Sequence, residues 1–98
     1  MQDIFPDFII IDDSKLDCFI AERIIQNVGQ HGVIRSFPDA STVLNEISQL
    51  PQPAGRTIIV LDIQMPVMNG FEFVEAFESL PLHKKMNYEI FMISSSVN

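Results

Sequence analysis

The sequence is poor in the residue types that build disulfide scaffolds, sulfur-ligated metal sites and basic surfaces. Its one cysteine, Cys18, excludes an internal disulfide and a multi-cysteine zinc site, and this usage is typical of a reducing cytoplasm. Only 6 lysine and arginine residues accompany 13 aspartate and glutamate residues, so the formal net charge is −7. A charge of this sign disfavours direct contact with nucleic acid or with an anionic membrane surface.

Long hydrophobic runs and a secretory signal are also missing from the sequence. No apolar run approaches the roughly 18 residues of a membrane-spanning helix, and the first residues are acidic. What is present is an apolar fraction of 47%, without tryptophan and without repeats or low-complexity tracts. A chain of 98 residues with this composition predicts one small globular domain over 1–98.

Strand and helix patterns alternate along the chain. Short apolar runs predict strands at 8–11, 33–37, 57–61 and 88–93, and helical periodicity predicts helices at 15–28, 38–50 and 71–80. Asp13 or Ser14 is expected to cap the first helix, and Gly29 with Gly32 to end it. The first helix carries an apolar face made of Leu16, Phe19, Ile20, Ile24 and Val28. The order predicts an α/β fold with a parallel sheet and helices on both faces.

Polar side chains follow three of these strands at the point where each strand ends. Asp12 and Asp13 follow the first strand, Asp62 follows the third and Ser94 follows the fourth. Ligands of parallel α/β sheets bind at the carboxyl ends of the strands, near the point where the strand order reverses. If these three strands are neighbours, three carboxylates and a hydroxyl converge on one edge of the sheet.

Such a cluster requires a proton or a cation to offset the repulsion among the carboxylates. At an effective dielectric of about 20, two carboxylates about 5 Å apart repel each other by roughly 3 kcal/mol. The donors of this cluster are hard oxygen atoms, which favours Mg²⁺ over zinc. An aspartate can also act as a nucleophile and form an aspartyl phosphate, with Ser94 donating its hydroxyl to a phosphoryl oxygen.

The same residues have simpler interpretations. Asp12, Asp13 and Ser14 can serve only to cap the first helix, and Asp62 can be an ordinary turn residue. Cys18 fits a small core or boundary position. The placement of all three acids and the serine at strand ends of one edge favours the functional interpretation.

Three segments resemble the response-regulator receiver family. They are Ile10–Ser14 (IIDDS), Leu61–Gly70 (LDIQMPVMNG) and Ile93–Ser95 (ISS), and the resemblance runs from about residue 7 to residue 98. The string Leu-Asp-x-x-Met-Pro-x-x-x-Gly is highly characteristic of the family. It implies a flavodoxin-like, doubly wound parallel sheet with strand order 2-1-3-4-5. Pro66 is expected to fix the loop, and Gly70 to allow an unusual backbone angle or close packing.

The resemblance implies a role for each polar residue at the sheet edge. Asp62 would accept a phosphoryl group from a histidine kinase or a histidine phosphotransfer protein. Asp13 and Asp62 would ligate Mg²⁺ directly, with the main-chain carbonyl of Gln64 as a third protein ligand. Asp12 would act mainly through a bound water. Ser94 matches the hydroxyl that turns toward the phosphoryl group on activation.

The chain departs from the family pattern after Ser94. A complete receiver continues with a fourth helix, a fifth strand and a fifth helix, and its fifth strand ends in a lysine that pairs with the phosphoryl group. Lys84 and Lys85 precede the last predicted strand and cannot take that place. We therefore expect an incomplete receiver fold of four strands and three helices, truncated after the fourth strand. Its open edge is expected to be covered by a partner or by a second copy, as a homodimer.

The leading hypothesis is a Mg²⁺-dependent phosphoacceptor switch of phosphorelay signalling, read by a downstream protein partner and not a turnover enzyme. A phosphohydrolase of the haloacid-dehalogenase type is disfavoured, because Gln64 stands where that class has a second aspartate. The alternative is a receiver-like interaction module that is not phosphorylated, because the C-terminal lysine is missing. Nucleotide binding has no support, since the sequence contains no glycine-rich phosphate loop.

Overall fold

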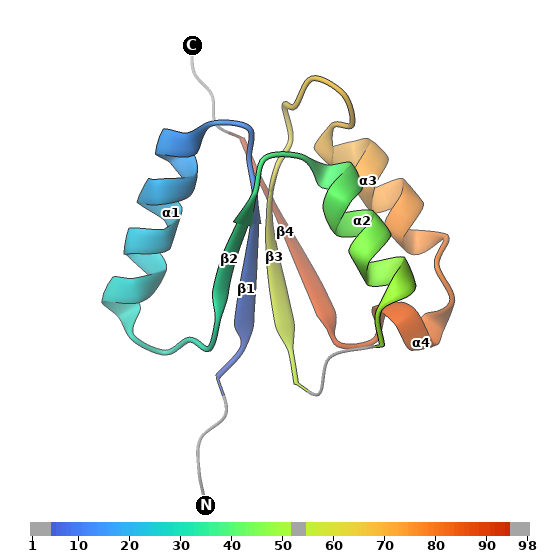
Figure 1. The fold of residues 1–98 in the computed structure, drawn as a ribbon, viewed down its shortest axis with the longest axis horizontal. Helices are drawn as coiled ribbons and strands as arrows, with labels where there is room; N and C mark the ends of the chain where they lie inside the picture. Colours follow the sequence, from blue (N-terminus) through green and yellow to red (C-terminus); the bar gives the residue numbers. More distant parts are fainter. Residues whose placement is uncertain (1–4, 52–54, 95–98) are drawn as a thin grey trace, which may run out of the picture.

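The protein, seen in a computed structural model that describes residues 5–51 and 55–94, alternates strands and helices (Figure 1). The elements in chain order are β1 (Asp7–Ile11), α1 (Lys15–Val28), β2 (Ile34–Phe37), α2 (Ala40–Gln49), β3 (Thr57–Asp62), α3 (Gly70–Glu78), α4 (Leu82–Lys85) and β4 (Tyr88–Ile93). Every predicted strand and helix is present, with ends within two residues of the expected ones. No helix in the described ranges is long and apolar enough to cross a lipid bilayer.

The short helix α4 corrects the expected number of three helices. It is a single turn between α3 and β4, begun by Pro81 and closed by a hydrogen bond from the Lys84 amide to the Pro81 carbonyl (2.9 Å). A proline suits the start of a helix because it needs no hydrogen-bond donor there. Four residues are too few for a helical period to show in the sequence. This turn precedes β4 and is distinct from the fourth helix of a complete receiver.

The four strands form one parallel sheet in the order β2-β1-β3-β4. Ile11 of β1 pairs with Leu61 of β3, and Asp62 of β3 pairs with Ile93 of β4. Because all the strands are parallel, their carboxyl ends lie at one end of the sheet. The order reverses between β1 and β3, which is where α/β sheets of this kind bind their ligands. The structure confirms the flavodoxin-like, doubly wound arrangement.

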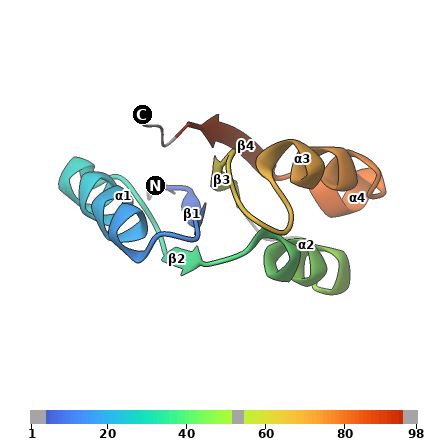
Figure 2. The ribbon, with the colours of Figure 1, turned by 90° about the horizontal axis from the view of Figure 1, so that it is seen from above.

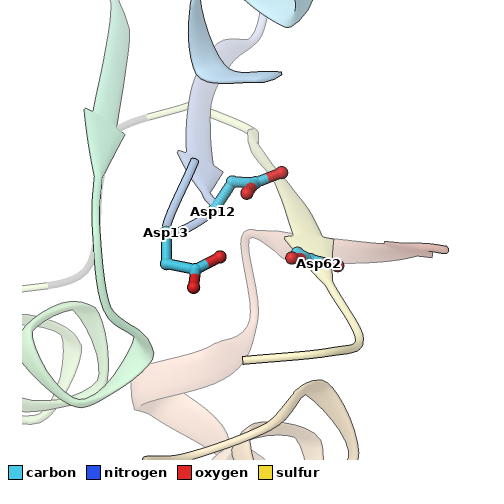
Figure 3. A group of neighbouring side chains, drawn as sticks. All are labelled: Asp12, Asp13 and Asp62. Atoms are coloured by element: carbon cyan, nitrogen blue, oxygen red, sulfur yellow. The ribbon is translucent and has the colours of Figure 1, made fainter. Parts of the chain in front are cut away.

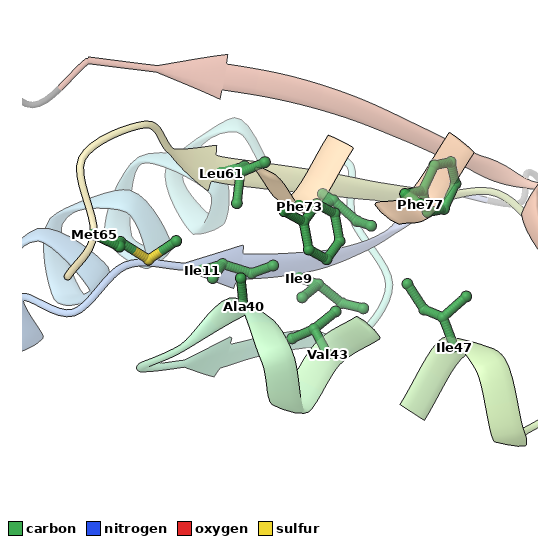
Figure 4. Packing of buried hydrophobic residues seen from close by; sticks show 10 residues of the cluster. Ile9, Ile11, Ala40, Val43, Ile47, Leu61, Met65, Phe73 and Phe77 are labelled. Atoms are coloured by element: carbon green, nitrogen blue, oxygen red, sulfur yellow. The ribbon is translucent and has the colours of Figure 1, made fainter. Parts of the chain in front are cut away.

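The main core lies between the sheet and the helices α2 and α3 (Figure 4). Its buried members are Ile9, Ile11, Ala40, Val43, Ile47, Ile59, Leu61, Met65, Phe73 and Phe77. The aromatic ring of Phe77 meets the ring of Tyr88 edge-on, with centroids 6.1 Å apart. Alternate residues of β1 and β3 face this core, so the packing holds these two strands side by side and carries their ends to one place.

The opposite face of the sheet is covered by α1 alone among the described elements, as Figure 2 shows from above. The apolar face of α1 is therefore not a buried one: no residue of α1 is buried, and Leu16, Phe19, Ile20, Ile24 and Val28 are between 46% and 68% exposed. On the same face of the sheet, Phe91 and Ile93 of β4 are 55% and 40% exposed. Helical periodicity predicted α1 correctly, but burial depends on a neighbouring layer that the described chain does not supply on this side.

Capping side chains fix where α1, α2 and α3 begin, and a glycine ends α1. Ser14 caps α1 by accepting a hydrogen bond from the Asp17 amide (3.2 Å), which selects the second of the two expected caps. Gly29 ends α1 with φ of +82°, a conformation that glycine adopts without steric cost. Asp39 caps α2, and Asn69 caps α3. The cap of α1 also sets the position of the acidic residues that precede it.

Candidate functional site

Three aspartates from two neighbouring strands meet at the carboxyl end of the sheet (Figure 3). Asp12 and Asp13 follow β1, and Asp62 is the last residue of β3. Each contributes a carboxylate oxygen, and these oxygens all lie within 4.8 Å of one another. Asp12 and Asp62 are only 4% and 1% exposed, whereas Asp13 is exposed. The structure thus brings Asp62 beside Asp12 and Asp13, which lie about fifty residues earlier in the sequence.

Main-chain hydrogen bonds hold two of these carboxylates in place. One carboxylate oxygen of Asp12 accepts from the Ser14 amide (2.9 Å), and one of Asp62 accepts from the Gln64 amide (3.2 Å). Each bond closes a turn of the kind that aspartate forms with the amide two residues later. The Asp12 amide in turn donates to the Phe37 carbonyl of β2 (3.1 Å). Asp12 and Asp62 are therefore held at the ends of the strands and do not swing freely.

Burial dominates the electrostatics of Asp12. It raises the pKa of the Asp12 carboxyl, and the negative charges of Asp62, Asp17 and Asp13 raise that pKa further. The hydrogen bond from the Ser14 amide opposes them but is outweighed. A bound divalent cation would act in the other direction, because it stabilises the ionised carboxylates.

The donor set suits Mg²⁺. All three ligand groups are carboxylates, and Mg²⁺ prefers oxygen ligands and binds through one or two carboxylates together with waters. Neither histidine nor cysteine belongs to the described group, so the set does not resemble a zinc site. The residues present therefore fit the ion that the sequence predicts.

The other two predicted site residues lie at the same edge. Ser94 directly follows Ile93, the residue of β4 that pairs with Asp62, so it stands at the end of the adjacent strand, where it is exposed. Gln64 is exposed two residues after Asp62, and its amide bonds to the Asp62 carboxylate. The carbonyl of Gln64 as a ligand and the hydroxyl of Ser94 as a switch stay predictions. Ser95, the end of the third matching segment, lies outside the described residues.

Gly70 brings the start of α3 against the end of β3. Its amide donates to the Ile63 carbonyl (2.9 Å), and a Cβ at this position would lie 2.9 Å from the Ile63 Cα and 3.1 Å from the Asp62 carbonyl oxygen. Of the described glycines, only Gly29 has a positive φ. Of the two expectations for Gly70, close packing is therefore correct and an unusual backbone angle is wrong.

Cys18 lies beside the acids, although its sequence context predicted only a core or boundary position. Cys18 is half-buried on α1, and its thiol donates to the main-chain carbonyl of Asp12 (3.4 Å). Burial, followed by the nearby charge of Asp12, raises the pKa of this thiol and keeps it protonated. Cys18, Asp12 and Asp13 all border a cavity of about 370 Å³ between α1 and β2. The sequence signal for this placement is helical spacing. Cys18 lies in the first turn of α1, and side chains of an α-helix lean toward its N-terminus, here toward the acids.

Residues 8–98 match the family described as "Response regulator receiver domain". The comparison with curated proteins gave no match. Among solved structures, the chain is similar to a response regulator receiver protein from Dyadobacter fermentans, with 37% identity and a TM-score of 0.81. The similarity covers 94% of this chain and 70% of that one.

Two further solved structures share the fold. A two-component response regulator from Cytophaga hutchinsonii is 25% identical, with a TM-score of 0.81, and the match covers 98% of this chain and 73% of that one. RcsB from Salmonella enterica serovar Typhimurium, bound to promoter rprA in the presence of phosphomimetic BeF₃⁻, is 18% identical, with a TM-score of 0.70 and coverage of 95% and 72%. The sheet order, the three converging acids and the match over residues 8–98 agree, and the chain belongs to the response-regulator receiver family.

Proposed function

We propose that this receiver accepts a phosphoryl group on Asp62 from a histidine kinase or a histidine phosphotransfer protein. The observation that carries the proposal is the position of the Asp62 carboxylate at the end of β3, within 4.8 Å of two further carboxylates. An Asp62 oxygen would attack the phosphorus, the bond between phosphorus and the donor nitrogen would break, and the histidine would leave. The amide of Gln64 holds the attacking carboxylate in a fixed orientation.

The neighbouring acids supply the setting for this transfer. Asp13 and Asp62, with the main-chain carbonyl of Gln64, would ligate Mg²⁺, and Asp12 would contribute through a bound water. When bound, the ion would neutralise charge on the carboxylates and on the phosphoryl oxygens. Without a cation, a phosphoryl group would add negative charge beside carboxylates that already repel one another.

Ser94 is proposed as the group that reads the phosphorylation. Its position at the end of β4, next to the strand that carries Asp62, supports donation from its hydroxyl to a phosphoryl oxygen. RcsB, which shares the fold, was described in the presence of a phosphomimetic. The resulting change would be passed to a downstream protein partner.

Receiver domains are signalling domains, and we propose no turnover beyond self-catalysed phosphoryl transfer and dephosphorylation. A cytoplasmic location is part of this proposal, because Cys18 is a free thiol.

Incubation with acetyl phosphate and Mg²⁺ tests the proposal. Intact-protein mass spectrometry should show one added phosphoryl group in the wild-type chain and none in Asp62→Asn, because the amide lacks the nucleophilic oxygen. Chelation of the metal with EDTA should also abolish the adduct. Glu75→Gln, on the exposed side of α3 and outside the three-acid group, is the matched control and should be labelled like the wild type. An adduct of equal size in Asp62→Asn would contradict the assignment.

A protein-interaction module that is not phosphorylated is the second candidate. The observation that favours it is the exposed apolar surface formed by α1 and β4 on one side of the sheet. On this reading the chain would bind Mg²⁺ in calorimetry but gain no phosphoryl group. We also propose that a second copy covers this surface, forming a homodimer.

A further inference from the structure

Cys18 makes two hydrogen bonds to the loop that carries the acids. Its amide donates to the Ser14 carbonyl (3.0 Å), and its thiol donates to the Asp12 carbonyl (3.4 Å). The first bond is the ordinary opening bond of α1. The second is a side-chain bond to the carbonyl of Asp12, the residue that directly follows β1. A cysteine thiol is a weak donor, which suits this longer distance.

The Asp12 carbonyl belongs to the peptide group that joins Asp12 to Asp13. The amide of Asp12 is held by the Phe37 carbonyl of β2, and the Asp12 side chain is held by the Ser14 amide. The thiol of Cys18 supplies the remaining restraint, on the peptide that joins Asp12 to Asp13. Rotation of that peptide would move the Cα of Asp13, whose carboxylate is exposed and has no main-chain amide bond like those of Asp12 and Asp62 among the described contacts.

From this arrangement we infer that Cys18 is a positioning residue for the cation site, fixing the Asp12–Asp13 peptide so that the Asp13 carboxylate points toward Asp12 and Asp62. The inference rests on the proposed Mg²⁺ site. It assigns no metal ligand and no chemistry to the sulfur itself. Its effect reaches the ion only through the main chain.

Paired substitutions separate a positioning role from a packing role. Cys18→Ala removes the donor, whereas Cys18→Ser keeps an O–H donor at the same position. Loss of a weak hydrogen bond of this kind should lower the Mg²⁺ affinity of Cys18→Ala about threefold, and Cys18→Ser should regain most of it. Ile25→Val, a half-buried position two turns further along α1, is the control for a loosened helix. It should lower the thermal midpoint without changing the affinity.

Two readouts decide the outcome. Isothermal titration with MgCl₂ gives the affinities, and the carbon-13 shift of the Asp12 carbonyl in metal-free protein reports the hydrogen bond directly. The inference predicts that this carbonyl shift moves in Cys18→Ala and returns toward the wild-type value in Cys18→Ser. Equal Mg²⁺ affinities for the wild type and Cys18→Ala would overturn the inference and leave the proposed site intact. A wild-type chain that binds no Mg²⁺ would overturn the metal site, and the inference with it.

Discussion

A single buried carboxylate illustrates how the site costs stability. Asp12 is 4% exposed, and its pKa is raised above 3.8, first by burial and then by the charges of neighbouring acids. The folded protein therefore binds the Asp12 proton more tightly than the unfolded chain does. It follows that ionised Asp12 lowers the stability of the metal-free fold above its raised pKa, and that this cost fades as the pH falls through that pKa and below 3.8.

Asp12→Asn should stabilise the metal-free protein at pH 7. The amide removes the buried charge, and its oxygen can still accept from the Ser14 amide. We expect the thermal midpoint in EDTA to rise by a few degrees. The difference from the wild type should shrink as the pH falls through the raised pKa of Asp12 and vanish below 3.8. Calorimetric melts across the pH range give the measurement. With Mg²⁺ the order should reverse, since binding of an ion stabilises only the protein that holds it.

At Gly70, close packing of α3 against the end of β3 links the stability of the fold to the position of Asp62. Gly70→Ala places a Cβ 2.9 Å from the Ile63 Cα, so either α3 or the loop after Asp62 must shift. Overpacking of this kind costs about 1–3 kcal/mol, measured as a lower free energy of unfolding in urea, and phosphorylation of Asp62 should slow. Glu75→Ala, on the exposed side of α3, should leave both quantities unchanged. A Gly70→Ala chain with wild-type stability would show that the close approach is readily relieved.

At the scale of the element, α2 depends on its cap. The Asp39 carboxylate accepts from the Thr42 amide (3.0 Å) and from the hydroxyls of Ser41 and Thr42. These bonds, the one from the Ser41 hydroxyl foremost, lower the pKa of Asp39 below 3.8. The helix that follows contributes Val43 and Ile47 to the core, so a loose start to α2 reaches the packing on β1 and β3.

Asp39→Ala should lower the free energy of unfolding at pH 7 by about 1 kcal/mol, the usual loss for a helix cap. Because the folded pKa is depressed, the stabilisation by ionised Asp39 is present above 3.8 and is lost as the pH falls through the lower, folded value. The difference between wild type and variant should therefore shrink in acid. Urea unfolding at a series of pH values measures it. Asp39→Asn keeps a capping oxygen without the charge, and its stability should lie between the other two.

For the whole molecule, the uneven covering of the sheet matters most. Helices α2, α3 and α4 lie on one side and α1 alone on the other, and the side of α1 exposes apolar residues on both the helix and β4 (Figure 2). On the edge strand β4, Phe91 is the most exposed of the large apolar residues, at 55%. Exposed edges with apolar side chains favour pairing with another chain.

The 98-residue chain should therefore self-associate at micromolar concentrations. Sedimentation equilibrium should give an average mass that rises from one copy toward two, and Phe91→Lys should shift the distribution toward monomer. Leu82→Lys, a 70% exposed position on α4 across the sheet, is the control and should behave like the wild type. A mass of one copy at every concentration would refute the homodimer.

The architecture was largely readable from local patterns. Short β-branched runs and helical spacing predicted each strand and the three longer helices, because alternation and periodicity are properties of neighbouring residues. The family string around Asp62 predicted the strand order and the acidic edge. The start of α1 at Ser14 and its end at Gly29 could also be predicted, because capping depends on residues next to the helix. The sequence did not predict α4, because a single helical turn is too short to show a helical period.

What depended on tertiary structure was burial and contact between distant segments. The apolar face of α1 looked like a core face in sequence, yet its exposure was decided by which layers lie beside it. The choice of close packing over a strained angle at Gly70, and the bond from the Cys18 thiol to the Asp12 carbonyl, likewise arise only when the helix is set against the strand ends. The sequence by itself determined which residues carry charge, donors and apolar surface along each element. Only the tertiary structure decided which of them meet and which stay open to water, because those outcomes depend on the positions of segments that share no local pattern.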